Sequence, residues 1–195
     1  MNAKQLALVI AFAALAIALN AIRIPAVFWP GNFFTLSEIP VVIAFFLFGV
    51  RIGVFVGFLN LLGQLAFFLI NPVYLVAYPM GFVAALLMLL GVYLACRLID
   101  IKDKAQNWGN RKKLVYLTAL SIAFRAGIMP IIDYKVFYGL LLPMFGYSIP
   151  EAYVMGLVPV FILFNLIAPL YTIPIAYTVT IQVKRSLKLQ TTLLK

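Results

Sequence analysis

The sequence is poor in the side chains that bind metals and carry out acid–base chemistry. It has no histidine, one cysteine (Cys96) and five acidic residues among 195. A zinc site built from His and Cys therefore cannot be assembled, and Cys96 cannot form a disulfide within the chain. The sequence also lacks the G-x-x-x-x-G-K-[ST] loop of P-loop nucleotidases and the G-x-S-x-G elbow of serine hydrolases. We therefore predict no metal site, no cofactor and no catalytic residue.

Charged residues of either sign are also scarce, at 10% of the chain, whereas 66% of the residues are hydrophobic and the mean hydropathy is +1.12. A soluble domain is about 45–50% apolar and about 25% charged. The excess of apolar residues is too large for one buried core, so the surface itself must be apolar and the solvent must be lipid. A cytosolic enzyme, a secreted disulfide scaffold and a disordered tail are excluded.

Continuous apolar runs fill most of the chain, and a spanning helix needs about 20 residues. The runs predict an all-α fold: one integral membrane bundle of six transmembrane helices over residues 1–195. Strands are unfavourable, because a spanning barrel alternates apolar and polar positions. Lys4 and the first run also suggest a signal peptide, but the run has the length of a span and we expect it to be retained. The helices are predicted near residues 5–27, 36–49, 52–70, 74–98, 114–132 and 149–183.

Basic residues predict the orientation of the bundle. Twelve of the fifteen Lys and Arg lie at the two ends of the chain or in the second and fourth connections between helices. The positive-inside rule places these segments, with both termini, in the cytoplasm of a cell membrane. The net positive charge is therefore explained by the orientation of the chain in the membrane, and this explanation argues against nucleic-acid binding. The twelve are Lys4, Arg51, Arg97, Lys102, Lys104, Arg111, Lys112, Lys113, Lys184, Arg185, Lys188 and Lys195.

Small residues form a stripe along the first helix. They are spaced by four, four, three and four positions, so they project from one helical face. Small faces allow two helix backbones to approach closely in lipid. The stripe can pack against helices of this chain, which spacing alone favours, or dock another membrane subunit. Its members are Ala3, Ala7, Ala11, Ala14 and Ala18.

Several polar residues lie within or near the outer half of the predicted membrane region. Such residues are costly in lipid and are therefore paired or functional. Arg125 falls near the middle of the fifth helix, where a structural pair and a functional role are equally plausible. A charged Asp133 in an apolar pocket needs a partner, for which Arg125 and Lys135 are the candidates. The residues assigned to a binding site are Glu38, Asn60, Asn71, Asp133 and Asn165.

Aromatic residues gather at the first two outer connections. Trp29, Phe33 and Phe34 lie in the first, and Tyr74 and Tyr78 begin the helix after the second. Aromatic belts at the membrane interface are common and explain such clusters without any ligand. The alternative is that Tyr74 and Tyr78 line a pocket for a planar ligand and that Trp29, Phe33 and Phe34 belong to a lid, residues 27–37, that closes over it.

Several runs resemble the S components of energy-coupling factor (ECF) vitamin transporters, most closely the riboflavin-specific branch. That branch has an S-D/E-I-P…FGP…G pattern in its second and third helices. This chain has LSEIPVVIAFFLFG over residues 36–49, followed by Gly53 and Gly57, with Val50 in place of the usual proline.

Two later runs extend the resemblance over most of the chain. Residues 133–134 and 142–146, DY and LPMFG, are similar to the family's N-Y…L-P-L-Y-G, and FNLI at 164–167 is similar to P-F-N-L-I-K-G. The resemblance implies a subunit that captures a vitamin from outside, in a pocket built mainly from helices 4–6 and the outer loops. It further implies association with a transmembrane coupling protein and two ATPases, and favours docking for the alanine stripe.

Three departures from the riboflavin pattern bear on the ligand. Asn60-Leu61 replaces a Lys-Asn pair, Ala168 replaces a lysine, and Asp133 replaces an asparagine. Loss of the lysine removes a donor for flavin carbonyls, whereas Asp133 can accept a bond from an imide N–H and would prefer a cation. We predict riboflavin or a related aromatic vitamin.

Other functions remain open at this point. An S component for another vitamin or small aromatic metabolite fits the same pattern. A self-sufficient secondary transporter would predict an inverted repeat, which the two halves do not visibly show. A membrane enzyme would need acids and bases clustered at one face, whereas the five acids are scattered. A purely structural membrane subunit would bind no vitamin.

Overall fold

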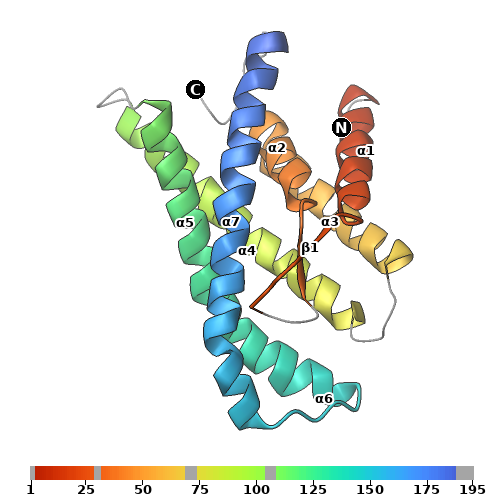
Figure 1. Cartoon of the computed structure of the whole chain (residues 1–195). Helices are drawn as coiled ribbons and strands as arrows, with labels where there is room; N and C mark the ends of the chain where they lie inside the picture. Colours follow the sequence, from red (N-terminus) through yellow and green to blue (C-terminus); the bar gives the residue numbers. More distant parts are fainter. Residues whose placement is uncertain (1–2, 29–31, 69–73, 104–108, 188–195) are drawn as a thin grey trace.

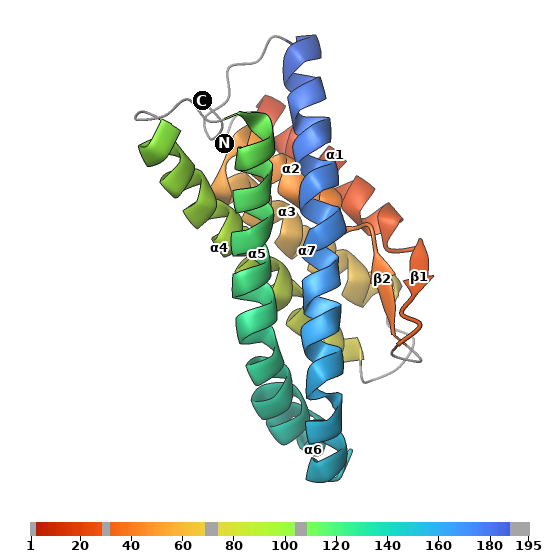
Figure 2. The same ribbon diagram turned by 60° about the vertical axis from the view of Figure 1, so that its left-hand side comes forward.

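The computed structural model describes residues 3–28, 32–68, 74–103 and 109–187, and most of these residues are helical. Pairs of helices pack along one another, with α4 against α5 and α5 against α7 as the most extensive contacts. Figures 1 and 2 show α5 and α7 side by side over much of their length. The elements are α1 (Ala3–Leu19), β1 (Arg23–Pro25), β2 (Phe33–Thr35), α2 (Glu38–Phe48), α3 (Val50–Phe67), α4 (Tyr74–Asp103), α5 (Asn110–Ile132), η1 (Asp133–Leu141), α6 (Leu142–Met144) and α7 (Glu151–Leu187).

A short hairpin replaces the end of the predicted first helix. Helix α1 ends at Leu19 and does not continue to residue 27, and two short strands follow it in a chain predicted to be all-α. Strands β1 and β2 pair antiparallel, with Arg23 opposite Thr35. Pro25 has no N–H and is unfavourable inside a helix. The Asn20 amide also donates to the carbonyl of Ala16 at 3.2 Å, which satisfies one of the last carbonyls of the helix.

Helix α2 is the centre of the core and too short to cross a bilayer. Its 11 residues extend about 16 Å, against a hydrocarbon thickness of about 30 Å. Every residue from Ile39 to Leu47 is buried. The continuous apolar sequence of α2 therefore reflects burial within protein. Four helical stretches are long and apolar enough to span a membrane: Val50–Phe67, Tyr74–Ile99, Asn110–Met144 and Glu151–Ser186.

Glycines allow the closest helix contacts. A Cβ on Gly53 would lie 2.8 Å from Cα of Phe45, and one on Gly91 would lie 2.6 Å from the carbonyl oxygen of Leu120. These distances are shorter than any ordinary carbon contact, so α3 can meet α2, and α4 can meet α5, only where the side chain is absent.

The π-helical segment η1 continues α5 beyond Pro130. A π-helix is wider than an α-helix and pairs residues five apart along the chain. Asp133 and Tyr138 therefore project toward the same side, and both reach the central cavity. Helix α5 ends at Ile132, but the helical path continues to Met144, farther than the predicted fifth helix.

The first helix begins, and the last helix ends, at the same end of the molecule. The start of α1, the end of α7 and the start of α5 are at the top of Figure 1, and α6 is at the bottom. Arg97, Arg111, Lys112 and Arg185 are exposed at the upper end. The chain therefore has one strongly basic end, opposite the half that contains the cavity.

Candidate functional site

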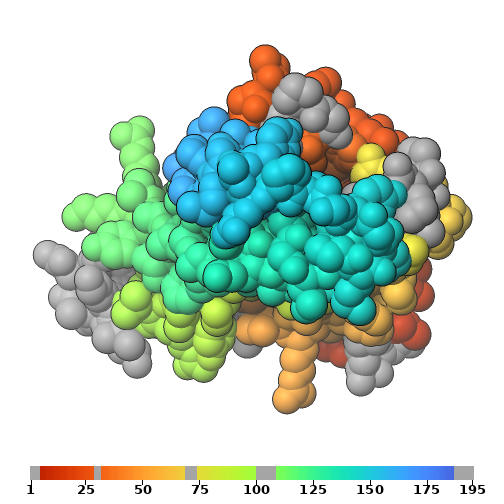
Figure 3. All heavy atoms as spheres, turned by 90° about the horizontal axis from the view of Figure 1, so that it is seen from below, coloured from red at the N-terminus to blue at the C-terminus, as the bar shows by residue number. Residues whose placement is uncertain are grey.

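A cavity of about 530 Å³ lies in the half of the molecule opposite the basic end. It is lined by the hairpin, by the end of α1, the start of α2, and the cavity-side halves of α3, α4, α5 and α7. In the view from below, η1, α6 and the start of α7 form much of the surface, and the hairpin lies at its edge (Figure 3). The first three helices therefore contribute to the site, in addition to the later helices named by the resemblance.

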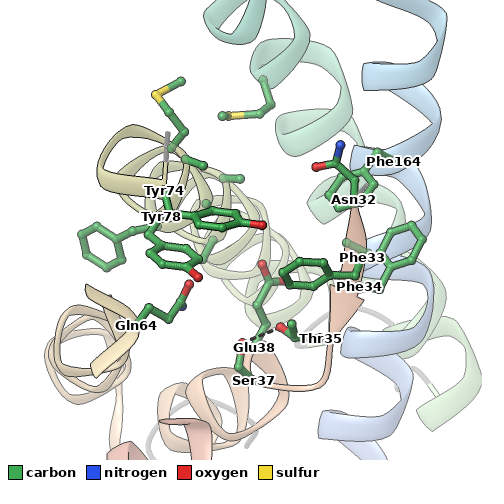
Figure 4. A pocket seen from close by; sticks show the side chains of 18 of the residues that line it. Asn32, Phe33, Phe34, Thr35, Ser37, Glu38, Gln64, Tyr74, Tyr78 and Phe164 are labelled. Atoms are coloured by element: carbon green, nitrogen blue, oxygen red, sulfur yellow. Dashed lines mark hydrogen bonds between the residues drawn. The ribbon is translucent and has the colours of Figure 1, made fainter. Parts of the chain in front are cut away.

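Aromatic rings form two facing walls (Figure 4). On α4, the rings of Tyr74 and Tyr78 stack with centroids 5.1 Å apart and planes 9° from parallel. The Tyr78 hydroxyl donates to the carbonyl of Phe68 at 2.7 Å, which fixes the ring. On the other side, Phe34 of β2 stacks on Phe164 of α7 at 4.4 Å and 12°. Rigid, parallel rings on both sides suit a flat, apolar ligand face.

The hairpin is attached to the bundle on both sides of the cavity. Tyr171 of α7 donates its hydroxyl to the carbonyl of Thr35 at 2.8 Å. The Arg23 guanidinium lies 4.4 Å from the ring centroid of Phe33 and 5.8 Å from that of Phe68. The Phe33 contact lies within the hairpin, whereas the Phe68 contact holds β1 near the end of α3.

A buried charged cluster forms the inner part of the site. Arg125 of α5 is 4% exposed, and its Nη1 lies 2.5 Å from the Glu38 carboxylate of α2. Its Nε donates to Oδ1 of Asn165 at 3.2 Å, and the Asn165 amide donates to the carbonyl of Phe161 at 2.9 Å. A charged group is stable at this depth only because it is paired and hydrogen-bonded.

Asp133 adds a second carboxylate beside this cluster. It interacts with Asn165 and with the charge of Arg125. Lys135, the other expected partner, is exposed, lies 5.5 Å from the ring of Tyr134, and does not line the cavity. Glu38 and Asp133 thus lie on either side of one buried guanidinium, and Arg23 adds a second cation to the lining of the cavity.

Side-chain amides line a third part of the cavity. Asn20 donates to Oδ1 of Asn60 at 2.7 Å, which joins the end of α1 to the middle of α3. Gln64, one turn after Asn60, lines the same part. These amides can offer both donors and acceptors to a ligand. In the described part of the chain, no three His, Cys, Asp or Glu side chains come together as a metal site.

The structure brings most of the predicted site residues together. Six of the seven residues assigned to substrate binding line the cavity: Glu38, Asn60, Tyr74, Tyr78, Asp133 and Asn165. Phe33 and Phe34, assigned to the lid, also line it. Asn71 and Trp29 lie outside the described residues.

The predicted binding site left out several residues that line the cavity. Four of them are polar residues within apolar runs of the sequence: Asn20, Arg23, Gln64 and Arg125. A polar residue in an apolar run can be recognised from the sequence, but the cavity that it faces cannot. Tyr138 and Tyr171 had no distinguishing signal among ten tyrosines. Their positions follow from η1 and from the hairpin contact.

The alanine stripe on α1 faces away from the bundle. Ala7, Ala11, Ala14 and Ala18 are exposed, whereas the opposite face of α1, with Val9, Ala13, Ala16 and Asn20, is buried. The side chain of Ala3 lies outside the described part of the chain. Packing of this stripe within the chain, the reading favoured by spacing alone, is therefore wrong for the four described alanines.

Comparison with known proteins identifies this architecture. No family model and no curated protein matches the chain. A solved structure of the S component of a bacterial ECF transporter is similar over 95% of each chain, with 25% sequence identity and a TM-score of 0.66. The chain has the fold of an ECF S component. Together with its four long apolar helices, this makes it a multi-pass membrane protein related in structure to a transporter subunit.

Proposed function

We propose that this protein is the substrate-capture subunit of an ECF-type ABC importer. The observation that supports it most is a cavity with aromatic walls and a polar interior, in a chain with the S-component fold. The protein binds a vitamin from outside the cell and releases it inward only through a separate, ATP-driven module. It has no catalytic activity of its own.

The best candidate ligand is riboflavin, with another vitamin or small aromatic metabolite as the alternative. Small-molecule sites usually have volumes of roughly 300–1,000 Å³, and the cavity is within that range at about 530 Å³. Its facing rings suit an isoalloxazine. Asp133 can accept from the imide N–H, and the amides of Asn20, Asn60 and Gln64 can bind a polyol or carbonyl groups.

The energy-coupling module would consist of a transmembrane coupling protein and two ATPases. The exposed alanines of α1 supply a face on which another membrane helix can approach closely. The described alanines assigned to docking are Ala7, Ala11, Ala14 and Ala18.

Ligand capture would involve the first outer connection. Strand β2 carries Phe33 and Phe34 into the cavity and is attached to α7 by Tyr171. Movement of residues 27–37 would open and close the path to the ligand.

A riboflavin titration tests the ligand. The detergent-purified protein is stripped of bound ligand by unfolding and refolding, and flavin fluorescence is followed with wild type and Asp133→Ala. We expect saturable quenching that is weaker in the variant. If well-folded wild type gives no quenching, riboflavin is the wrong ligand. Other vitamins would then be compared by thermal shift, because a ligand that binds only the folded state raises its stability.

A further inference from the structure

The charge of the basic end is concentrated on three neighbouring helices. Helix α4 packs on α5 and α5 packs on α7, and the ends of all three lie at the top of Figure 2. Residues 97–113 and 184–185 together hold eight basic and two acidic residues, a net charge of +6. We call the six basic residues whose side chains the structure describes the basic patch: Arg97 on α4, Arg111, Lys112 and Lys113 on α5, and Lys184 and Arg185 on α7.

Packing of the helices brings these charges to one height. A Cβ on Gly91 would lie 2.6 Å from the carbonyl oxygen of Leu120, so α4 and α5 touch there. Arg97 lies six residues beyond Gly91 on α4, and on α5, which runs in the opposite direction, Lys113 lies seven residues before Leu120. At 1.5 Å per residue, both are about 10 Å closer to the basic end than the contact point. Lys184 of α7 interacts in turn with the charge of Lys113.

This concentration of like charge is unfavourable for the protein alone. Lys113 and Lys184 are partly buried, so water and salt screen their repulsion less than at an open surface. Arg111, Lys112 and Lys113 also occupy the first turn of α5, and the start of a helix favours negative charge. A bound anion would relieve both costs.

Arg97 is held along α4, toward the apolar part of the helix. Its Nε and Nη2 donate to the Tyr93 hydroxyl at 3.1 and 2.9 Å, and its guanidinium lies 5.3 Å from the centroid of the Tyr93 ring. Tyr93 precedes Arg97 by one helical turn. A guanidinium has five N–H donors in a planar fork, so Arg97 can bind a phosphate while it donates to Tyr93.

Exposed apolar residues continue directly from the basic patch. Leu90 is two turns from Arg97 on the same face of α4, and it is 42% exposed. Val115 is one turn from Arg111 on the same face of α5, and it is 63% exposed. A water-soluble acidic protein would cover the charges alone. A phospholipid covers both surfaces, because its phosphate meets the charges and its acyl chains meet the apolar residues.

We propose that the basic patch, with the apolar faces beside it, binds an anionic phospholipid of the leaflet at the basic end. The phosphate oxygens accept from Arg97 and from the cations of α5 and α7, and the acyl chains lie along α4 and α5. The inference depends on the membrane location of the chain and is independent of the vitamin and of the capture function. The positive-inside rule predicts the side on which cations lie, but no preference for three helices.

Stabilisation by lipid tests the proposal, because a ligand that binds only the folded state raises the thermal midpoint. The full chain, delipidated in a neutral detergent, is titrated with phosphatidylglycerol, or with phosphatidylcholine of the same acyl chains. Inorganic phosphate is the third probe, with the charge but without the chains. The patch variants are Arg97→Gln and Lys112→Gln. Arg51→Gln is the matched control, since Arg51 is an exposed arginine at the start of α3 and removes the same charge.

We expect phosphatidylglycerol to raise the midpoint of wild type, and the other two probes to leave it nearly unchanged. Each patch variant should raise the apparent dissociation constant for phosphatidylglycerol about 5-fold, the effect of one cation at an anionic lipid surface, whereas Arg51→Gln should not. Lys112→Gln provides the result if Arg97→Gln fails to fold without its contact to Tyr93.

Three results would overturn the proposal. Equal weakening by Arg51→Gln would mean a diffuse attraction to charge, and equal stabilisation by phosphatidylcholine or phosphate would mean that no anionic lipid is selected. No stabilisation of wild type by phosphatidylglycerol would exclude the lipid. If the patch variants then also lose co-purification with the coupling protein and ATPases, and Arg51→Gln does not, the basic patch binds an acidic protein surface.

Discussion

Arg125 shows how a single residue can be both costly and necessary. Its guanidinium is buried and shared among Glu38, Asn165 and the neighbouring Asp133. Burying an ion pair is costly, and its net contribution to stability is small, but removing one partner leaves the other charge buried and unpaired. The pair also joins α5 to α2, whose remaining residues are almost entirely apolar and buried.

Removing Arg125 alone should destabilise the protein more than removing Arg125 and Glu38 together. Arg125→Met should destabilise the ligand-free protein by about 3–5 kcal/mol, because Glu38 loses its partner. The double variant Arg125→Met/Glu38→Leu should recover part of that loss. The measurement is the thermal midpoint in detergent. If the double variant is at least as unstable as the sum of Arg125→Met and Glu38→Leu, the two residues do not act as a pair.

Helix α1 has two faces of different composition. Its buried face carries Val9, Ala13, Ala16 and finally Asn20, which lines the cavity. Its outer face carries Ala7, Ala11, Ala14 and Ala18, with larger exposed residues such as Ile10 and Leu15 beside them. One rigid element therefore connects the cavity to the face that we assign to docking.

Enlarging that outer face should impair assembly and leave ligand binding intact. Ala11→Leu adds bulk where close helix approach is needed, so co-purification with the coupling protein and ATPases should fall markedly. Ala123→Leu is the matched control, since Ala123 is an exposed alanine on α5. Equal assembly of the two variants would show that the module docks elsewhere.

At the scale of the whole molecule, charge and cavity lie at opposite ends. The start of α1 and the end of α7 are at one end with Arg97, Arg111 and Arg185, and the cavity is in the other half (Figure 1). The positive-inside rule predicts that the basic end faces the cytoplasm and that the cavity half faces outward. This is the orientation that capture from outside requires.

Cysteine labelling in intact cells tests the orientation. The single native thiol, Cys96, is buried and can be replaced by alanine. In that background Ser148→Cys, in the connection between α6 and α7, should react with an impermeant maleimide. Ser186→Cys, near the end of α7, should react only after the cells are opened. Both serines are exposed, so reversal of the pattern would mean the opposite topology.

Some features follow from the sequence because they depend on local composition alone. The membrane location, the approximate helix positions and the basic end are predicted from hydropathy and charge summed over neighbouring residues. These sums require no knowledge of packing. Polar residues such as Glu38, Asp133 and Asn165 were identifiable because each is costly in apolar surroundings unless it is used. The spacing of the α1 alanines likewise predicted one common face.

Only the tertiary structure decided which of these residues meet, and which face of each helix is outside. Glu38 and Arg125 are 87 positions apart, and no local pattern pairs them. The hairpin at Arg23–Pro25 and Phe33–Thr35 exists because its strands pair with each other and Tyr171 holds the second strand. Helix α2 has the hydropathy of a span, but protein surrounds it in place of lipid. Hydropathy measures transfer out of water, which is equally favourable into lipid and into a protein core, so only packing can distinguish the two.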